Sequence, residues 1–442
     1  MLNIVTENKL LFVGTHVLIG FLATFSQFPI LFGSLVIIIG VIIIFSSSNK
    51  SEEALLLSGY VVGVEVFLRM TEGFISYETG KYGVALFLTL GMFVGPIKQQ
   101  LNISFVIYIL LLLLGIVFTQ VPEGESIRKA ILFNLTGPIS LGICALYLYK
   151  RPLSYKEIAS VLFFVLLPII SMVTYMYFRT PNLSEIVFGT DSSFVTSGGF
   201  GPNQVTTILG FGMFILGVFL YLKTKITGYL ILDIIMLLYF TFRGLLTFSR
   251  GGVITAAIGF IVFSILLILY RKGSIMLIFK YLLVSGVFIT GVWLYTSDVT
   301  GGMLDNRYTG KDATGKKKDV TSGRIDLFSN QLEGFKEAPL FGIGVGNGKY
   351  KREIEGKLVT TSHNEVSRLI EEHGTIGVII LMILVIIPAS HFYNKNNFQR
   401  AFLISFFLFW FLTINHSAMR IAFPALAYGL CLINITTDET EE

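Results

Sequence analysis

Apolar residues run through this chain in long blocks separated by short polar turns. About fourteen blocks are long enough to cross a bilayer, which takes roughly 17–25 residues in a helix. Their approximate limits are residues 9–25, 29–46, 54–70, 81–97, 103–119, 129–148, 157–177, 203–222, 227–243, 250–270, 277–296, 375–392, 400–415 and 418–434. Glu65 interrupts the third block and Asp233 the ninth, so these two are the weakest predictions. The pattern predicts an all-α polytopic membrane protein with about 12–14 transmembrane helices.

One long polar segment, from about Thr296 to Ser362, breaks this pattern before apolar sequence resumes near residue 375. We therefore divide the chain into three parts. Residues 1–296 are predicted to form the amino-terminal part of a transmembrane bundle, and residues 297–374 a large external catalytic loop with short amphipathic helices. Residues 375–442 are predicted to form the last transmembrane helices and a cytoplasmic tail.

Composition agrees with the membrane class. Hydrophobic residues make up 53% of the 442 residues, charged residues 14%, and the mean hydropathy is +0.75. An ordinary soluble domain has about a quarter of its residues charged. Only two cysteines occur, which excludes a disulfide framework. No H-E-x-x-H or D-x-D motif is present, and we predict neither a metal site nor a cofactor.

The distribution of basic residues predicts the orientation, because cytoplasmic turns are enriched in Lys and Arg. With the amino terminus inside, eleven basic residues fall in cytoplasmic turns and seven in the opposite short turns. Both termini are then cytoplasmic and the polar segment is external. The net charge of +5 is explained by this orientation better than by nucleic-acid binding.

His363 is the strongest candidate for chemistry in the polar segment. Ser362 and Glu365 fit a capping box, which places His363 in the first turn of a helix. A helix amino terminus attracts anions, and the pKa of His suits proton transfer near neutral pH. The alternative is an ordinary polar residue at a helix end.

Two arginines are candidates for holding an anion. Arg324 begins a predicted amphipathic helix in which Ile325, Phe328, Leu332 and Phe335 share one face, with Ser322 as its N-cap. Arg250 begins the tenth block, where the helix dipole disfavours a cation unless an anion offsets it. The alternative for Arg250 is snorkelling to lipid headgroups.

A glycine-rich run lies between these features, at residues 342–348. Backbone amides of such a run can cradle phosphate, although the run lacks the strand and helix that flank a nucleotide-binding loop. A flexible turn is an equally good interpretation.

Four motifs in order resemble the bacterial O-antigen ligase and O-antigen polymerase superfamily. They are G-F-G-P-N-Q at Gly199–Gln204, S-R-G-G at Ser249–Gly252, S-G-R with P-L-F-G-I-G-V-G within Ser322–Gly346, and H-N with E-x-G-x-x-G within His363–Gly377. They cover about residues 198–380, while the first half matches only as apolar spans. The resemblance implies a GT-C-like glycosyltransferase of the bacterial inner membrane. The chain departs from the usual pattern in having about fourteen spans rather than twelve.

The resemblance implies an undecaprenyl-pyrophosphate-linked glycan as donor and no nucleotide sugar. Arg250 and Arg324 would hold the pyrophosphate, and His363 would be the catalytic residue, acting as a general base in an inverting transfer. The candidate substrate-binding residues are Arg250, Arg324, Asn364, Asn203, Gly344 and Gly346.

The sequence does not identify the molecule that carries the acceptor hydroxyl. The hydroxyl can belong to another lipid-linked glycan, to a lipid A core or to a protein, so ligase, polymerase and protein glycosyltransferase remain alternatives. A transporter or flippase of lipid-linked glycans is the alternative from another class. It would need ionisable residues within the membrane. The only candidates are Glu65, Asp233, Lys280 and Arg420.

Overall fold

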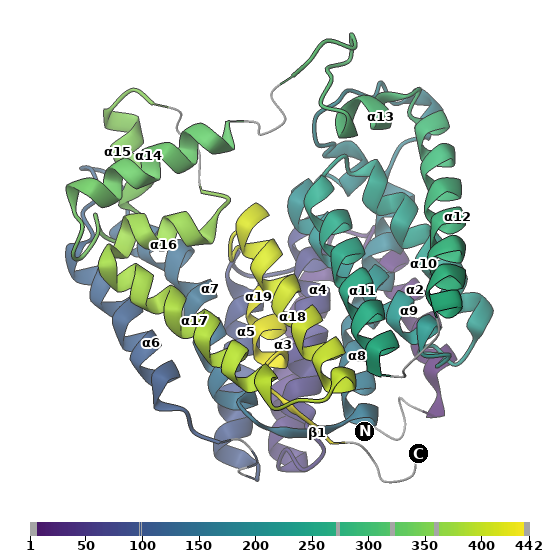
Figure 1. The fold of residues 1–442 in the computed structure, drawn as a ribbon, viewed down its shortest axis with the longest axis horizontal. Coiled ribbons are helices and arrows are strands. Elements are labelled where there is room, and N and C mark those ends of the chain that lie inside the picture. Colours follow the sequence, from purple (N-terminus) through teal and green to yellow (C-terminus); the bar gives the residue numbers. More distant parts are fainter. Residues whose placement is uncertain are drawn as a thin grey trace.

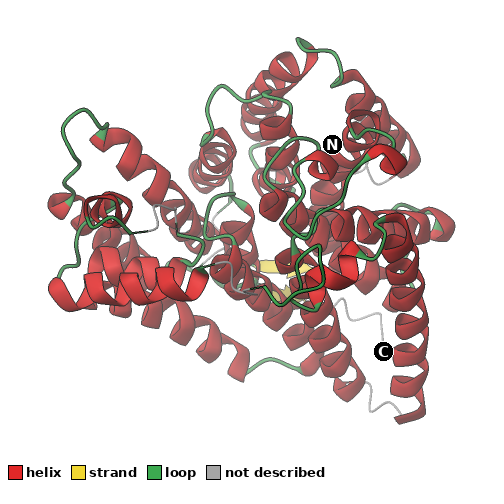
Figure 2. Cartoon of the chain, turned by 90° about the horizontal axis from the view of Figure 1, so that it is seen from above, coloured by secondary structure: helices red, strands yellow, loops and turns green. Residues whose placement is uncertain are grey.

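The computed structural model describes residues 7–96, 98, 100–270, 275–318, 323–357 and 362–436, and it is almost entirely helical (Figures 1 and 2). The helices that correspond to apolar blocks are α2 (Lys9–Leu22), α3 (Phe28–Ser47), α4 (Glu53–Met70), α5 (Thr79–Val94), α6 (Ile103–Leu114), α7 (Ile127–Leu148), α8 (Tyr155–Arg179), α9 (Pro202–Tyr221), α10 (Leu230–Leu246), α11 (Arg250–Tyr270), α12 (Ile275–Val299), α17 (Thr375–Tyr393), α18 (Asn397–His416) and α19 (Phe423–Leu430). The polar segment contributes α13 (Met303–Tyr308), α14 (Arg324–Glu337), α15 (Asn347–Ile354) and α16 (Glu365–His373). Short 3₁₀ turns are η1 (Gly115–Phe118), η2 (Leu183–Glu185) and η3 (Val195–Ser197), and the strands are β1 (Pro152–Ser154) and β2 (Asn434–Thr436).

Each predicted apolar block contains one helix, and the all-α polytopic class is confirmed. Among the described residues, seven helices are long and apolar enough to cross a membrane by length and composition: α3, α7, α8, α9, α11, α17 and α18. The last block is shorter than predicted. Its helix α19 has only eight residues, whereas a crossing takes about 20.

The two weak blocks are helical because the structure satisfies their carboxylates. Glu65 of α4 pairs with Arg69 one turn later, at 2.5 Å. Asp233 of α10 accepts hydrogen bonds from the backbone amides of Ile226 and Thr227, which precede the helix. A satisfied carboxylate does not interrupt an apolar helix in the way that an isolated charge does.

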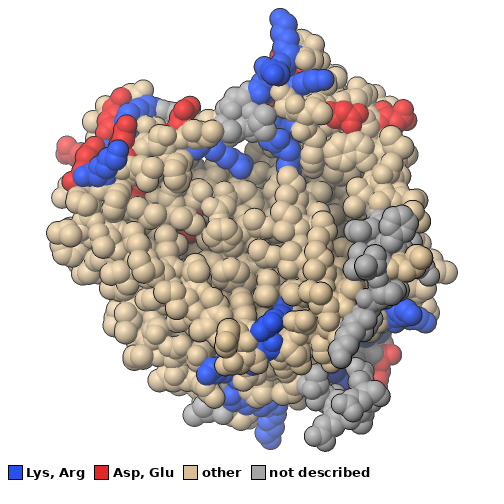
Figure 3. Space-filling view, in the orientation of Figure 1, with Lys and Arg blue, Asp and Glu red and all other residues tan. Residues whose placement is uncertain are grey.

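The bundle has a buried centre and an apolar outer surface. In α8 and α9, 89% and 83% of the most apolar window is buried, against 22% in α3 and 28% in α17. The outer faces of α3 and α17 expose large aliphatic side chains such as Ile38, Ile42 and Ile386. Figure 3 shows charged side chains at the upper and lower ends and few on the broad surface between them. This arrangement is typical of a protein surrounded by lipid.

The two ends of the bundle carry different elements. At the lower end in Figure 1, β1 pairs with β2 in parallel, which brings the carboxy-terminal end of the described chain to the start of α8. Helix α2 begins at the same end, because Lys9 lies over the ring of Phe163 in α8. Helices α13 to α16 lie at the upper end. The first and last described elements therefore lie opposite the polar segment, as the orientation requires; which end faces the cytoplasm stays a prediction.

The predicted amphipathic helix is α14, and it begins at Arg324 as expected. Its N-cap position is taken by Gly323, and Ser322 lies outside the described residues. Leu327, Gln331 and Gly334 are buried, and α14 packs against α16. Ile325 and Phe328 of the predicted apolar face are exposed, by 63% and 43%. That face is free to contact the membrane surface.

Candidate functional site

His363 lies directly before α16, and not in its first turn. The N-cap is Asn364, whose side chain accepts a hydrogen bond from the amide of Ser367. Ser362 instead turns back on Asn364, donating its hydroxyl to the carbonyl oxygen at 2.8 Å and accepting from the amide at 3.2 Å. Glu365 pairs with Arg368 within the helix. The predicted capping box is therefore wrong, because the helix begins two residues later.

The loop between α18 and α19 holds the segment around His363. The amide of Ala418 donates to the His363 carbonyl oxygen at 3.0 Å. Arg420 donates from Nη2 to the Ser362 carbonyl oxygen at 2.9 Å. Asn364 donates from Nδ2 to Oδ1 of Asn415, at the end of α18, at 3.0 Å. The position of the imidazole therefore depends on the last helices of the chain.

His363 is surrounded by positive charge. Burial is the largest of the causes that lower the pKa of His363 to about 4, and electrostatic repulsion by Arg420, Arg324 and His416 contributes the rest. The imidazole is therefore neutral at pH 7, as a general base requires. Nδ1 is buried without a hydrogen bond to any described residue.

Four arginines form what we call the arginine cluster: Arg250, Arg307, Arg324 and Arg420. They come from α11, α13, α14 and the loop after α18. Burial and then Arg250 lower the pKa of Arg324. Burial, Arg250 and Arg324 lower the pKa of Arg307, and Asp191 opposes them. These mutual repulsions would be relieved by a bound anion.

Hydrogen bonds hold the Arg307 side chain beside the amino-terminal end of α11. Its Nε donates to the Phe248 carbonyl oxygen at 3.0 Å, and its Nη2 donates to the Ser192 hydroxyl at 3.4 Å. This places a third arginine beside the two that the motifs suggested. In Figure 3, blue side chains flank a notch in the upper face between the parts that carry α13 and α14.

The glycines after Arg250 serve close packing. A Cβ at Gly252 would collide with the Thr206 carbonyl of α9, and a Cβ at Gly251 would collide with the ring of His416. The neighbouring helices therefore fill the space beside both glycines and leave no room there for a ligand. Because neither glycine has a side chain, α11 packs closely against α9 and α18 and holds Arg250 beside them.

Asn203 lies in the first turn of α9. Its Oδ1 accepts a hydrogen bond from the Ser249 hydroxyl at 2.7 Å, which ties α9 to the residue before Arg250. Asn364 is the N-cap of α16 and follows His363 directly. Both asparagines therefore lie beside the residues predicted to react, and their contact with substrate stays a prediction.

The glycine-rich run is a packed turn. Gly344 has φ of +91°, and a Cβ there would collide with the Phe118 carbonyl. The amides of Ile343 and Gly344 donate to the carbonyl oxygens of Glu371 and Glu372 at 3.0 and 3.1 Å. Gly346, at φ +78°, lines a cavity beside Arg420. Of the two predicted glycines, the structure brings Gly346 to an open space and buries Gly344 against η1.

The buried ion pair between Glu65 and Arg69 of α4 holds the backbone of the loop after α18. Oε2 of Glu65 accepts from the amide of Ala422 at 2.6 Å. Nη1 of Arg69 donates to the Arg420 carbonyl oxygen at 2.8 Å and to Oε1 of Gln204 at 3.0 Å. Both charges are almost fully inaccessible. The pair fixes the backbone from which the Arg420 side chain reaches the site.

An apolar groove between α10 and α12 leads toward the arginine cluster. It has a volume of about 640 Å³ and is lined by nine residues: Ile235, Leu238, Tyr239, Phe242, Val287, Phe288, Gly291, Val292 and Tyr295. Its upper end adjoins a small apolar group in which Trp293 meets the ring of Tyr308 at 4.7 Å between centroids. Tyr308 follows Arg307 directly and lies near Arg250. One end of the groove therefore lies near the charged site, through Trp293 and Tyr308.

Sequence reasoning missed three residues of this site. The sequence presents Arg420 only as an ionisable residue within an apolar block, and His416 and Arg307 belong to none of the four motifs. The signal that could have found Arg420 was its cost: a charge within an apolar stretch persists where it has partners or a function.

A sequence profile of the family described as O-antigen ligase matches residues 234–382. The matched region contains Arg250, Arg307, Arg324 and His363 and ends before Arg420. No curated protein matches the chain.

Proposed function

We propose that this chain, which belongs to the O-antigen ligase and polymerase superfamily, moves a glycan from an undecaprenyl-pyrophosphate carrier to a hydroxyl acceptor at the outer face of the bacterial inner membrane. The match to the family supports the general part of the proposal, namely that the chain is a glycosyltransferase of the ligase or polymerase type. The donor, the direction of attack and the role of His363 are our proposals.

The observation that carries the proposal is the arginine cluster beside a neutral imidazole. The guanidinium groups of Arg250, Arg307 and Arg324 repel one another and are expensive to assemble without an anion, and Arg420 adds a further positive charge beside His363. A pyrophosphate offers several oxygens to guanidinium groups, which bind such oxygens in pairs. The cluster lies at the end of the bundle, where the headgroup of a membrane lipid would lie.

In the proposed step, the acceptor oxygen attacks the anomeric carbon of the donor glycan. The bond from that carbon to the pyrophosphate oxygen breaks, and the lipid pyrophosphate leaves with the electron pair. The hydroxyl proton passes to the imidazole of His363. The arginine cluster stabilises the charge that develops on the leaving group, which is the largest contribution in many enzymes. Attack opposite the leaving group inverts the anomeric carbon.

The apolar groove is a second observation in favour of a donor with a polyprenyl chain. A long isoprenoid chain needs apolar surface from the membrane up to the site of its pyrophosphate. The groove between α10 and α12 offers this surface, and the rings of Phe242 and Tyr295 lie at its wall with centroids 5.3 Å apart. The rings of Trp293 and Tyr308 continue it toward Arg307.

The described residues do not favour a transporter. Glu65 is committed to Arg69 and to the backbone of Ala422. Asp233 is bound by the turn before α10, and Arg420 belongs to the site around His363. Transport would need ionisable groups along a path across the membrane.

A transfer assay tests the proposal. The purified protein in detergent should convert an undecaprenyl-pyrophosphate glycan and a glycan acceptor into the lengthened glycan and free undecaprenyl pyrophosphate in equal amounts. Mass spectrometry measures both products. If the lipid-linked glycan is unchanged but crosses the bilayer of vesicles containing the protein, the transporter alternative is correct.

The pH dependence follows from the environment of His363. The neutral imidazole is the active form, so kcat/KM should be flat near neutral pH and fall as the pH drops through about 4, where the free enzyme takes up the proton. Replacing Arg324 with Gln removes one repelling cation, so the pKa of His363 rises and the acid limb of the residual activity moves to higher pH. An acid limb that stays in place in Arg324→Gln would separate Arg324 from His363.

A further inference from the structure

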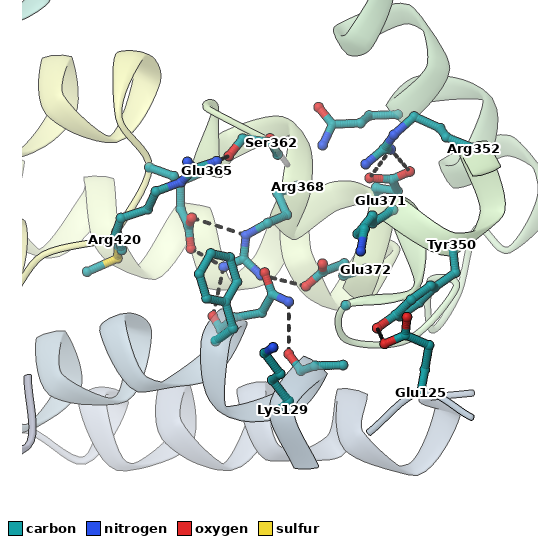
Figure 4. Close-up of a pocket in the computed structure, with 18 residues that line it drawn as sticks. Glu125, Lys129, Tyr350, Arg352, Ser362, Glu365, Arg368, Glu371, Glu372 and Arg420 are labelled. Carbon is teal, nitrogen blue, oxygen red and sulfur yellow. Dashed lines mark hydrogen bonds and ion pairs between the residues drawn. The ribbon is translucent and has the colours of Figure 1, made fainter. Parts of the chain in front are cut away.

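A polar cavity lies beside Arg420 and beside Ser362, the residue that precedes His363 (Figure 4). It encloses about 230 Å³ between α7, α14, α15, α16 and the loop after α18. Cavities for drug-sized ligands are usually larger, at about 300–1,000 Å³. The volume therefore suits a single ring with polar substituents.

The walls of the cavity carry charged side chains, most of which form ion pairs with one another. Arg368 bonds to Glu365 and, at 2.6 Å, to Glu372. Arg352 bonds to Glu371 at 3.0 Å. All five side chains are at least nine-tenths buried, and Figure 4 shows them along one side of the cavity. Paired and buried charges of this kind present fixed donors and acceptors to a neutral polar ligand rather than a net charge to an ion.

One buried amide nitrogen in this wall has no well-formed hydrogen bond among the described residues. Gln331 of α14 is 1% exposed, and its Oε1 accepts from the Ser367 hydroxyl at 2.6 Å. Its Nε2 lies close enough to Glu371 to lower the pKa of that carboxyl, yet it makes no hydrogen bond of normal geometry with any described residue. An amide without a well-formed hydrogen bond in a cavity wall points to a ligand that accepts a hydrogen bond from it. Burial also raises the pKa of Glu372 to about 7, so this carboxyl can donate as well as accept at neutral pH.

Aromatic rings form the outer part of the cavity. Tyr350 and Phe133 line it, and the Tyr350 hydroxyl bonds to Oε2 of Glu125 at 3.1 Å. A sugar ring has apolar C–H faces and an edge of hydroxyl groups. Aromatic rings beside paired carboxylates and amides match both parts.

The position of the cavity assigns it to one of the two substrates. Ser362 and Arg420 line it, whereas Arg250, Arg307 and Arg324 are not among the described residues of its wall. The cavity therefore adjoins the segment of His363 and the loop after α18 without being lined by the three other arginines. In an inverting transfer, the attacking oxygen and the leaving group lie on opposite faces of the anomeric carbon. If the three arginines hold the leaving pyrophosphate, a cavity beside the segment of His363 that they do not line is available to the acceptor.

We propose that this cavity binds the terminal sugar of the acceptor and presents its hydroxyl to His363. The inference rests on the proposed function for the identity of the acceptor, and on the cavity alone for sugar binding. It selects a glycan acceptor, such as a growing polysaccharide or a core oligosaccharide, over the hydroxyl of a protein side chain.

Two variants of the full-length protein test the cavity. Gln331→Met keeps the shape of the side chain and removes the free amide. Tyr350→Ala removes the aromatic wall. Asn330→Met is the matched control, since Asn330 is the neighbour on α14 and is not among the residues that line the cavity. The probe is the soluble repeat-unit oligosaccharide released from the host's lipid-linked glycan, titrated calorimetrically into protein in detergent.

We expect the oligosaccharide to bind wild type, His363→Gln and Asn330→Met with equal affinity. Loss of one hydrogen bond should raise Kd roughly threefold to tenfold in Gln331→Met, and Tyr350→Ala should weaken binding at least as much. In transfer assays, Gln331→Met should raise the KM of the acceptor and leave the KM of the donor unchanged.

Equal affinity of wild type, Gln331→Met and Tyr350→Ala would overturn the inference. A raised KM for the donor alone would do so as well, because the cavity would then hold the donor glycan. Cavity-dependent binding by a wild-type protein that transfers nothing would instead refute the proposed function and leave the sugar site in place.

Discussion

Replacing His363 with Gln should lower the rate of glycan transfer by a factor of roughly 10²–10⁴, the range that a general base contributes. Glutamine keeps the approximate size and hydrogen-bonding capacity of the imidazole but cannot take up a proton at neutral pH. The backbone of His363 is held by Ala418, and this bond does not involve the side chain. The variant should therefore fold and bind the lipid-linked donor normally. Initial rates with purified protein, beside a donor-binding assay, measure both effects.

His391→Gln is the matched control for this variant. His391 lies in α17, and its Nε2 meets the Ile433 carbonyl oxygen at 2.9 Å, near β2 and far from the site. Glutamine can make a similar bond, so this variant should transfer at the wild-type rate. If His363→Gln transfers at nearly the wild-type rate, the base must be sought elsewhere, first at Glu365 and Glu372. Both of those carboxylates are paired with Arg368, so either would need a rearrangement to act.

Arg250→Ala and Arg324→Ala should each lower kcat/KM by roughly 10- to 100-fold, the loss expected for one charge-assisted contact. The effect should be larger on kcat than on the KM of the donor if the arginines act mainly on the leaving pyrophosphate. Lys at either position should restore activity only in part, since an ammonium cannot form the paired bonds of a guanidinium. Steady-state kinetics with purified variants separate these effects.

Arg179→Ala serves as the control, because Arg179 is exposed at the end of α8, at the same end of the bundle. It should behave as wild type. Full activity in both alanine variants of the cluster would remove the pyrophosphate site. Full activity in Arg324→Lys would argue only against paired bonding.

The helices could be predicted from sequence because the requirement for continuous apolar residues is local. Each block yielded one helix, including the two that contain Glu65 and Asp233. What the sequence could not supply is the partner of each charge. In the sequence, Glu65 is a charged residue that interrupts an apolar block. In the structure it bonds to Arg69 and to the amide of Ala422, which is 357 positions further along the chain.

The site was predictable in part for the same reason. Arg250, Arg324 and His363 stand in motifs, and the structure links His363 and Arg250 electrostatically through Arg324. The helix start was misplaced because Ser362 and Asn364 are both good N-caps, and spacing alone does not decide between them. The glycine run was ambiguous because a ligand cradle and a packed turn need the same residue type.

The bonds from Ala418 and Arg420 make the segment of His363 depend on residues that follow the region matched by the family profile. The helices that bear Arg250 and Arg324 lie within that region, whereas the contacts that fix the backbone of His363 come from the loop after α18. A fragment cut at the limits of the profile is therefore a poor substitute for the full chain in assays of the proposed transfer. A chain that ends before residue 418 would keep every residue matched by the family profile and still lack a completed centre.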